Sequence, residues 1–180
     1  MIVDFRTVID FWFKEIDPKQ WWVKDADFDN QIHERFGELH QQAVQGELFG
    51  WRESAVGRLA EIIVLDQFSR NIYRDQPQAF GADALALGLA QEAIKNGCHL
   101  ELQGDYRSFM YMPFMHSESK IIHQVAEQLF SDPEVGNLDF ELQHKKIIDQ
   151  FGRYPHRNKI LDRKSTPEEI EFLTQPNSSF

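Results

Sequence analysis

Cysteine is almost absent from the sequence, with Cys98 the single example among 180 residues. One thiol excludes an intrachain disulfide and a zinc site built on cysteine pairs. Long apolar runs are also absent, and no window approaches the roughly 18–20 uninterrupted apolar residues of a membrane span. The N-terminal stretch is interrupted by Asp4, Arg6 and Asp10, so it lacks the pattern of a signal peptide. We therefore expect a cytoplasmic protein with no membrane partner.

Positive charge is scarce, because 19 Lys and Arg stand against 29 Asp and Glu, for a net charge of −10. Phosphate repels an acidic surface, so nucleic acid is not an expected partner. Residues 144–164 are the exception, with seven Lys and Arg against two acids, a net +5 that leaves −15 for the rest of the chain. A basic island in an acidic chain indicates a local anion site.

The motifs of several common chemistries are missing as well. The sequence has no glycine-rich phosphate loop, dinucleotide fingerprint, His-Glu-x-x-His motif or nucleophile elbow. His116 and Glu118 are two potential metal ligands, but no third ligand follows at a telling spacing. The sequence therefore predicts no metal site and leaves any cofactor unknown.

Helical periodicity and aromatic residues are abundant. The 15 Phe, four Trp and four Tyr indicate a bulky folded interior. Apolar residues recur at helical spacing, which predicts helices at 4–16, 28–48, 53–73, 79–96, 106–112, 118–130 and 138–151, and a last one starting at 166. Short loops between these helices predict antiparallel packing, as in a bundle or an α-solenoid. We expect an all-α fold that forms a single domain over residues 1–180.

Particular residues mark where these helices begin and end. Thr166, Pro167 and Glu169 occupy the N-cap, first and third positions of the last predicted helix, a specific start signal. Gly97 is typical of a left-handed helix stop. Pro113 is expected to end the 106–112 helix, because proline lacks the N–H that an interior turn requires.

One face of the 53–73 helix changes from apolar to charged. Ile63 lies on the same stripe as Asp66 and Arg70 at 100° per residue. Asp66 and Arg70 are four residues apart and can pair, and a buried carboxylate is costly without such a partner. This pattern predicts a pocket lined by Asp66, Arg70 and Asn71. The alternative is an ordinary salt bridge where the helix leaves the core.

A second cluster follows Pro113. If a helix ends there, His116 lies at the N-terminus of the next helix, where backbone N–H groups favour anions, and Glu118 lies in its first turn. The expected role of His116 is that of a semi-buried histidine able to titrate. The alternatives are a satisfied loop histidine and a Glu118 that only complements the helix dipole.

A third cluster covers residues 151–158, where Arg153, His156, Arg157 and Asn158 follow one helix end. Arginine is suited to a bidentate grip on carboxylate or phosphate, and a stiff loop favours a precise site. The alternative is a solvated loop whose arginines cap the preceding helix.

Other chemically capable residues are expected to be structural. His144 falls on an apolar face and is predicted to be a hydrogen-bonded core histidine. His33 and His40 are predicted to lie on the surface. The tryptophans are interpreted as packing rings rather than a stacking platform.

The stretches 65–71, 112–118 and 151–158, with the Trp21-Trp22 pair and residues 165–169, together resemble the bacterial domain-of-unknown-function family 924. The resemblance covers nearly the whole chain. It implies an all-helical fold similar to tetratricopeptide-like α-solenoids, and it implies no established activity. One departure is Ser69, where the family pattern has proline, so the local helix bend is left open.

The leading hypothesis is a site for a small anionic ligand. The candidate binding residues are Asp66, Arg70, Asn71, Arg153, Arg157 and Asn158. The arginines would hold a carboxylate or phosphate, and Asp66 would orient Arg70. The candidate catalytic residues are His116, Glu118 and His156. Either histidine would act as general acid or base, with Glu118 orienting His116, in hydrolysis or another proton transfer.

Two rival hypotheses remain open. A helical-repeat module without catalysis would present a groove that receives an acidic peptide. An internal polar network would fix the core arrangement and leave no cavity. The ligand, the reaction and the oligomeric state are not determined by the sequence.

Overall fold

The computed structural model describes residues 3–179, and within this range it is all-helical, with no strand. The α-helices are α1 (Phe5–Asp10), α2 (Ala26–Val44), α3 (Ala55–Ile63), α4 (Ser69–Ile72), α5 (Asp83–Lys95), α6 (Gly104–Met115), α7 (Lys120–Phe130), α8 (Leu138–Phe151) and α9 (Pro167–Phe172). Two π-helical turns occur at η1 (Phe11–Glu15) and η4 (Val64–Phe68). The 3-10 turns are η2 (Pro18–Trp22), η3 (Phe49–Glu53), η5 (Pro77–Phe80), η6 (Cys98–Glu101) and η7 (Pro155–Arg157).

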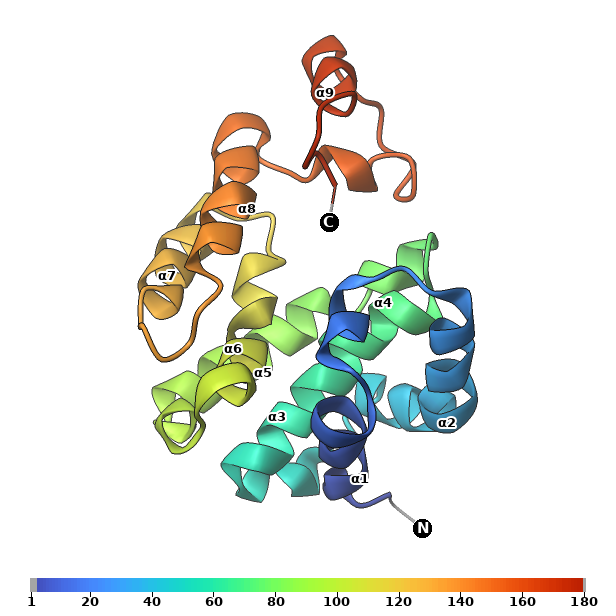
Figure 1. Ribbon diagram of the computed structural model, residues 1–180, viewed down its shortest axis with the longest axis vertical. Helices are drawn as coiled ribbons and strands as arrows, with labels where there is room; N and C mark the ends of the chain where they lie inside the picture. The colour runs from blue at the N-terminus through green and yellow to red at the C-terminus, as the bar shows by residue number, and fades with distance from the viewer. Residues whose placement is uncertain (1–2, 180) are drawn as a thin grey trace.

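The centre of the fold is the unbroken helical rod formed by α3, η4 and α4. It contacts α1, α2, α5 and α6, as Figure 1 shows. Its middle residues Ile62–Leu65 are fully buried, because this segment is apolar on every side. Buried rings such as Trp12 and Phe68 pack edge to face against each other and fill the space around the rod.

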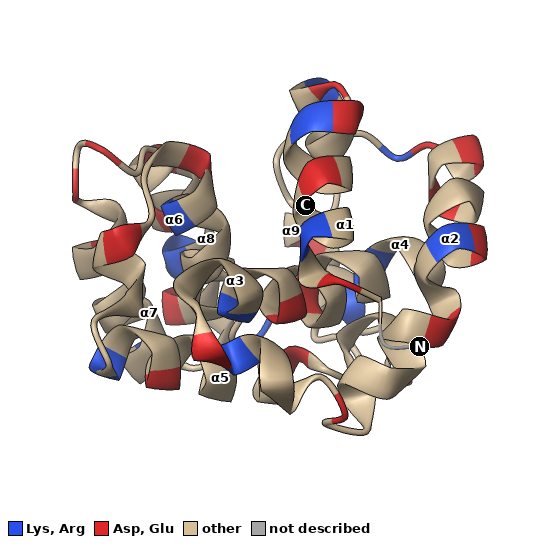
Figure 2. Ribbon diagram, turned by 90° about the horizontal axis from the view of Figure 1, so that it is seen from below, with Lys and Arg blue, Asp and Glu red and all other residues tan. Residues whose placement is uncertain are grey.

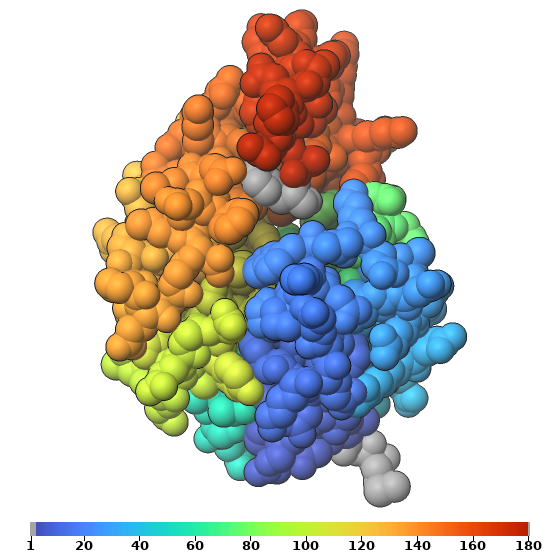
Figure 3. All heavy atoms as spheres, in the orientation of Figure 1, coloured from blue at the N-terminus to red at the C-terminus, as the bar shows by residue number. Residues whose placement is uncertain are grey.

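The C-terminal part packs α6, α7 and α8 as consecutive antiparallel helices, and α9 lies at the far end of the molecule (Figure 1). Thr166 and Glu169 form the predicted capping box at the start of α9. The space-filling view shows a hollow between the orange α7–α8 region and the blue N-terminal segment (Figure 3). The candidate site lies in the space between these two parts.

The predicted helices are present, and the all-α fold class is confirmed. Pro113 is the main correction, because it lies inside α6, which continues to Met115. The cost of one lost backbone hydrogen bond is outweighed by burial of every residue from Arg107 to Met115. His116 is therefore the C-cap of α6, and not the start of the next helix. Glu118 precedes α7, which begins at Lys120, so it lies outside the first turn.

One of the two histidines that were predicted to lie on the surface is buried. His33 is exposed as predicted, but His40 is buried and contacts the Ser69 hydroxyl at 2.7 Å. Ser69 in turn donates to the Leu65 carbonyl, so the helical rod continues through this position. On α2, Arg35 is the single Lys or Arg residue, and it lies among Asp and Glu residues (Figure 2). Within residues 3–179, no helix combines the length and the apolar content needed to cross a membrane.

Candidate functional site

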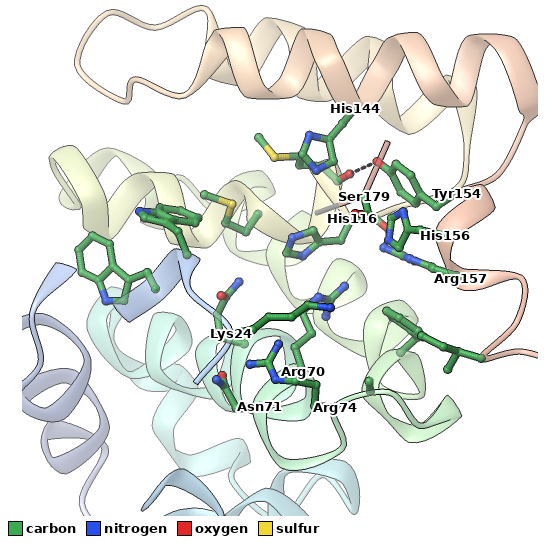
Figure 4. A pocket seen from close by; sticks show the side chains of 18 of the residues that line it. Lys24, Arg70, Asn71, Arg74, His116, His144, Tyr154, His156, Arg157 and Ser179 are labelled. Atoms are coloured by element: carbon green, nitrogen blue, oxygen red, sulfur yellow. Dashed lines mark hydrogen bonds between the residues drawn. The ribbon is translucent and has the colours of Figure 1, made fainter. Parts of the chain in front are cut away.

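A cavity of about 690 Å³ lies between the α4 end of the central rod and the C-terminal part of the chain. Its walls come from the segment after η2, from η4 and α4, from η5, from the end of α6, from α8, and from residues 154–160. Figure 4 shows Lys24, Arg70 and Arg74 on one side and His116, His156 and Arg157 on the other. Among the described residues that line it, the titratable nitrogen side chains are Lys24, Arg70, Arg74, His116, His144, His156 and Arg157.

The π-helical turn η4 holds the central carboxylate. Asp66 and Gln67 lie in this turn, and Asp66 is 1% exposed. The Gln67 side-chain amide donates to Asp66 Oδ2 at 2.6 Å. A π turn carries a wider backbone ring than an α turn, and such turns are frequent at functional sites. The turn therefore places an oriented carboxylate directly behind the cavity.

Asp66 and His116 form a hydrogen-bonded pair, with Asp66 Oδ1 2.7 Å from His116 Nδ1. Burial raises the pKa of Asp66, but the charges of His116 and Arg70 outweigh it and bring that pKa to about 2. Burial and the neighbouring Arg70 charge lower the pKa of His116, so the neutral ring is the form expected at pH 7. A carboxylate only accepts, so Nδ1–H donates to Asp66 and Nε2 carries the lone pair.

His116 Nε2 is the reactive atom of this pair. It makes no hydrogen bond to the residues that the structure describes, and the ring borders the cavity (Figure 4). An imidazole held in one tautomer by a carboxylate is the usual arrangement of a general base. The pair can therefore accept a proton from a group bound in the cavity.

Two guanidinium groups lie next to this pair. Arg70 donates to both oxygens of Asp83, at 2.9 and 3.0 Å, and to the backbone oxygen of Asp66 at 2.7 Å. Arg157 donates to the His116 carbonyl at 3.1 Å and lies 3.4 Å from Asp83. The Phe80 ring lies 4.5 Å from the Arg157 guanidinium carbon. These contacts fix both cations before any ligand arrives.

The outer part of the cavity carries two more cations. Arg74 pairs with Asp29 through Nε and Nη2, and the Asn71 amide donates to the same carboxylate at 2.8 Å. Lys24 is exposed, and within residues 3–179 it has no ion pair. Lys24 extends across the cavity near Arg70 (Figure 4).

His144 and His156 also border the cavity. Burial lowers the pKa of His144 to about 3 and that of His156 to about 4, so both rings are neutral at pH 7. His144 is buried and contacts the Phe140 carbonyl at 2.7 Å, as predicted for a core histidine, yet its ring also reaches the cavity wall. The part of the chain that the structure describes holds no cluster of three or more His, Cys, Asp or Glu side chains that could bind a metal ion.

The structure brings together most of the sequence-predicted residues and separates the rest. Arg70, Asn71, His116, His156 and Arg157 line the cavity, and Asp66 lies directly behind it. Glu118, Arg153 and Asn158 do not line it.

Each of these three residues is engaged elsewhere. Arg153 forms a bidentate pair with Glu169, at 2.6 and 2.8 Å, because the left-handed Gly152 turns the chain toward α9. Asn158 donates to the same Glu169 at 3.1 Å. Glu118 accepts from Arg163 and from the Tyr154 backbone N–H. The expectation that Glu118 orients His116 is therefore wrong, and Asp66 has that role.

Several cavity residues were not predicted from the sequence. Lys24 comes from a segment far from the three clusters, and no local signal marked it. Trp22 was interpreted as a packing ring, but it is 60% exposed and lines the cavity. Asp83, which contacts Arg70 and Arg157 without lining the cavity itself, resembles an ordinary acid in the first turn of a helix. Arg74 was detectable in principle, since it lies four residues after Arg70 on the charged stripe of the central rod.

Comparison with known proteins identifies the family of this chain. A family model described as a bacterial protein of unknown function (DUF924) matches residues 8–177. The chain belongs to this family, which confirms the resemblance inferred from its three stretches. A solved protein of unknown function from Agrobacterium tumefaciens is similar, with 42% identity, a TM-score of 0.89, and coverage of 94% of this chain and 96% of that one. No functionally curated protein matches.

Proposed function

We propose that the protein binds a small organic anion in the cavity and that the Asp66–His116 pair acts there as the general base of a hydrolytic reaction. The observation that carries the proposal is the 2.7 Å contact that orients a neutral His116 at a cavity also lined by the two fixed guanidinium groups of Arg70 and Arg157. Few purely structural arrangements place a base and cations around open space.

Binding follows from the fixed arginines. Asp83 holds Arg70 from behind and lies against Arg157, so neither side chain must be ordered when a ligand arrives. Guanidinium N–H groups match the oxygens of a carboxylate or phosphate. In this proposal the anionic group of the ligand lies near Arg157 and Arg74, and the reacting bond lies next to His116.

Catalysis would begin with a water molecule between His116 and the ligand. Nε2 takes one proton from this water while its oxygen forms a bond to an electrophilic carbon. Asp66 stabilises the resulting imidazolium. The bond to the leaving group then breaks, and the leaving group takes the proton back from Nε2. Arg157 offers N–H donors to the negative oxygen that develops in between.

Peptide binding is the alternative function, and the shape of the site argues against it. An acidic peptide needs an open groove with arginines along its floor. Arg70 and Arg157 instead have side chains that are 20% and 7% exposed, and they border a cavity sized for a small molecule. We therefore favour the small-molecule function.

The binding half of the proposal is tested by a thermal-shift screen of carboxylates and phosphates, followed by calorimetry. A ligand of the cavity raises the melting temperature of the wild type. Arg157→Lys keeps the charge but loses the planar fork, so we expect it to weaken binding about tenfold. Arg6→Ala, at an exposed arginine, serves as the control and leaves affinity unchanged. If no anion stabilises the protein, the binding proposal fails.

The catalytic half is tested with p-nitrophenyl acetate and p-nitrophenyl phosphate. We expect saturable hydrolysis of at least one of them, and its loss in His116→Gln. His33→Gln is the matched control, because an exposed histidine accounts for any unspecific attack on the ester. Equal rates in the two variants and the wild type would exclude His116 as the base.

A further inference from the structure

The charges around the cavity are almost balanced, which restricts the ligand. Arg70 and Arg157 share Asp83, and Arg70 also lies 3.3 Å from Asp66. Arg74 is paired with Asp29. Three guanidinium groups therefore already have three carboxylates beside them. A ligand with several negative charges would gain little net attraction here, because the neighbouring carboxylates largely cancel the positive potential of each arginine.

The histidines add no charge to this balance. His116, His144 and His156 all have lowered pKa values because of burial, so their rings are neutral at pH 7. Lys24 is the lining cation without an ion pair among the described residues, and the exposed Asp75 is the lining acid. Four cations thus face four acids, so one negative charge can lie near Lys24, whereas several would leave the cavity strongly negative.

Aromatic and apolar side chains form much of the remaining wall. The rings that line the cavity are Trp21, Trp22, Phe80, Phe140 and Tyr154. Trp22 is 60% exposed and Phe140 is 56% exposed, although both are large apolar groups. Exposed rings at the edge of a cavity are typical of a ligand site, because a bound apolar group removes them from water.

The exposed Trp22 ring is held in place by the aromatic residues packed against it. The Trp22 ring stacks on Phe109 at 6.0 Å with an interplanar angle of 11°. Trp21 Nε1 donates to the Trp12 carbonyl at 3.0 Å, which anchors the same turn. Lys24 follows Trp22 by two residues, so one segment presents a fixed flat surface together with a cation that has no ion pair within residues 3–179.

Building on the proposed function, we infer that the ligand is an aromatic monoanion, such as an aryl carboxylate, and not a polyphosphate or other highly charged metabolite. The planar part lies against Trp22, and the single negative charge lies between Lys24 and the Arg157 and Arg74 guanidinium groups of the proposed site. The apolar rim and the balanced interior favour such an amphipathic molecule over a free phosphate.

Calorimetry and tryptophan fluorescence with three probes test this inference. The probes are 2-naphthoate, its uncharged counterpart 2-naphthalenemethanol, and pyrophosphate. We expect 2-naphthoate to bind more than about tenfold tighter than pyrophosphate and to quench tryptophan emission. Trp22→Ala weakens 2-naphthoate binding about tenfold, as for loss of a stacking platform. Lys24→Met weakens 2-naphthoate but leaves 2-naphthalenemethanol unchanged.

The matched control for Trp22→Ala is Phe49→Ala. Phe49→Ala removes another exposed aromatic ring, 70% exposed and outside the cavity lining, and leaves every affinity unchanged. Tighter binding of pyrophosphate than of 2-naphthoate overturns the inference while the proposed anion site stands. Binding of 2-naphthoate that ignores both Trp22→Ala and Lys24→Met also overturns it. If neither anion binds and no other anion stabilises the protein, the proposed function fails as well.

Discussion

Within residues 3–179, two carboxylate–histidine pairs have the same separation and opposite surroundings. Asp66 lies 2.7 Å from His116, and Glu141 lies 2.7 Å from His123. Asp66 also has Arg70, and its pKa falls to about 2 despite burial. Burial raises the pKa of Glu141, and the opposing effects of His123 and Lys145 do not outweigh it. The same contact thus yields a firmly ionised acid in one place and a weakened acid in the other.

The histidines of the two pairs differ in a second way. His123 is fully buried, and both its nitrogens are engaged, with Glu141 and with the Ser117 carbonyl at 2.8 Å. His116 engages one nitrogen and turns the other toward the cavity. A short Asp/Glu–His contact is therefore not enough to indicate a site. The neighbouring cation and the open face are what distinguish the first pair.

The largest difference between the pairs is expected in catalysis. His116→Gln should lower the rate of hydrolysis of the p-nitrophenyl probe by about 10²–10⁴-fold, the usual contribution of a general base. His123→Gln should change that rate per folded molecule by less than about threefold. Steady-state kinetics measure both. A larger rate loss in His123→Gln than in His116→Gln would reverse the comparison.

The next largest effect is on stability, and it belongs to the sealed pair. His123→Ala leaves Glu141 buried without its partner, so the free energy of unfolding should fall by about 3 kcal/mol. In His116→Ala the missing ring leaves space open to the cavity, where water can reach Asp66 and Arg70 remains beside it. The free energy of unfolding should therefore fall by only about 1 kcal/mol. Urea unfolding of both variants measures the difference. Equal losses would mean that both pairs are structural.

Acid should destabilise the protein mainly through the cavity histidines. His144 and His156 have folded pKa values of about 3 and about 4, below the ordinary 6.5 of an unfolded chain. Their contribution is present above pH 6.5 and is lost as the pH falls, by about 2 kcal/mol per histidine at pH 5. The raised pKa of Glu141 acts in the opposite sense, adding stability at low pH that is lost as the pH rises.

Unfolding measured from pH 7 to pH 5 checks this sign. In His144→Gln the loss between these pH values should shrink by about 2 kcal/mol, because one proton fewer is taken up on unfolding. In His33→Gln, at an exposed histidine, the loss should stay as in the wild type. Stability that increases on acidification would contradict the assignment of neutral histidines.

The smallest effect is expected at the residue that touches both regions. Tyr154 lines the cavity, donates to the Met115 carbonyl at 2.6 Å, and lies 3.2 Å from His123 Nε2. Tyr154→Phe should lower the free energy of unfolding by about 1 kcal/mol, the cost of one buried hydrogen bond. Tyr106→Phe, whose ring stacks on Phe13, is the control. A loss above about 3 kcal/mol would indicate that the two pairs form one network.

Much of the fold was predictable because helical periodicity and caps are local signals. The Thr166 capping box and the left-handed Gly97 occur as the sequence indicates. Pro113 was misjudged because its local cost is outweighed by burial of the surrounding α6 side chains, which only the assembled fold reveals. The tetratricopeptide-like arrangement and the single-domain assignment stay predictions.

The site was predictable to the extent that its residues share a helix face or a short segment. Asp66 and Arg70 were found because they are four residues apart on one stripe. Arg153 was misplaced because its partner, Glu169, lies 16 residues away, and no spacing rule identifies which acid a loop arginine will meet. Lys24 and Trp22 reach the cavity only through packing of distant segments.

The π-helical turn at Val64–Phe68 makes the site depend on chain length as well as on residue type. A π turn accommodates one residue more than regular α geometry. Deleting a single residue there would leave an ordinary α-helix in which α3 and α4 keep their register, whereas the residues inside the turn would be displaced around the helix axis. Asp66 lies inside this turn and would no longer meet His116, although Arg70 in α4 would keep its direction. Point substitutions can thus change single contacts of this helix, whereas a one-residue deletion would separate the carboxylate from its histidine.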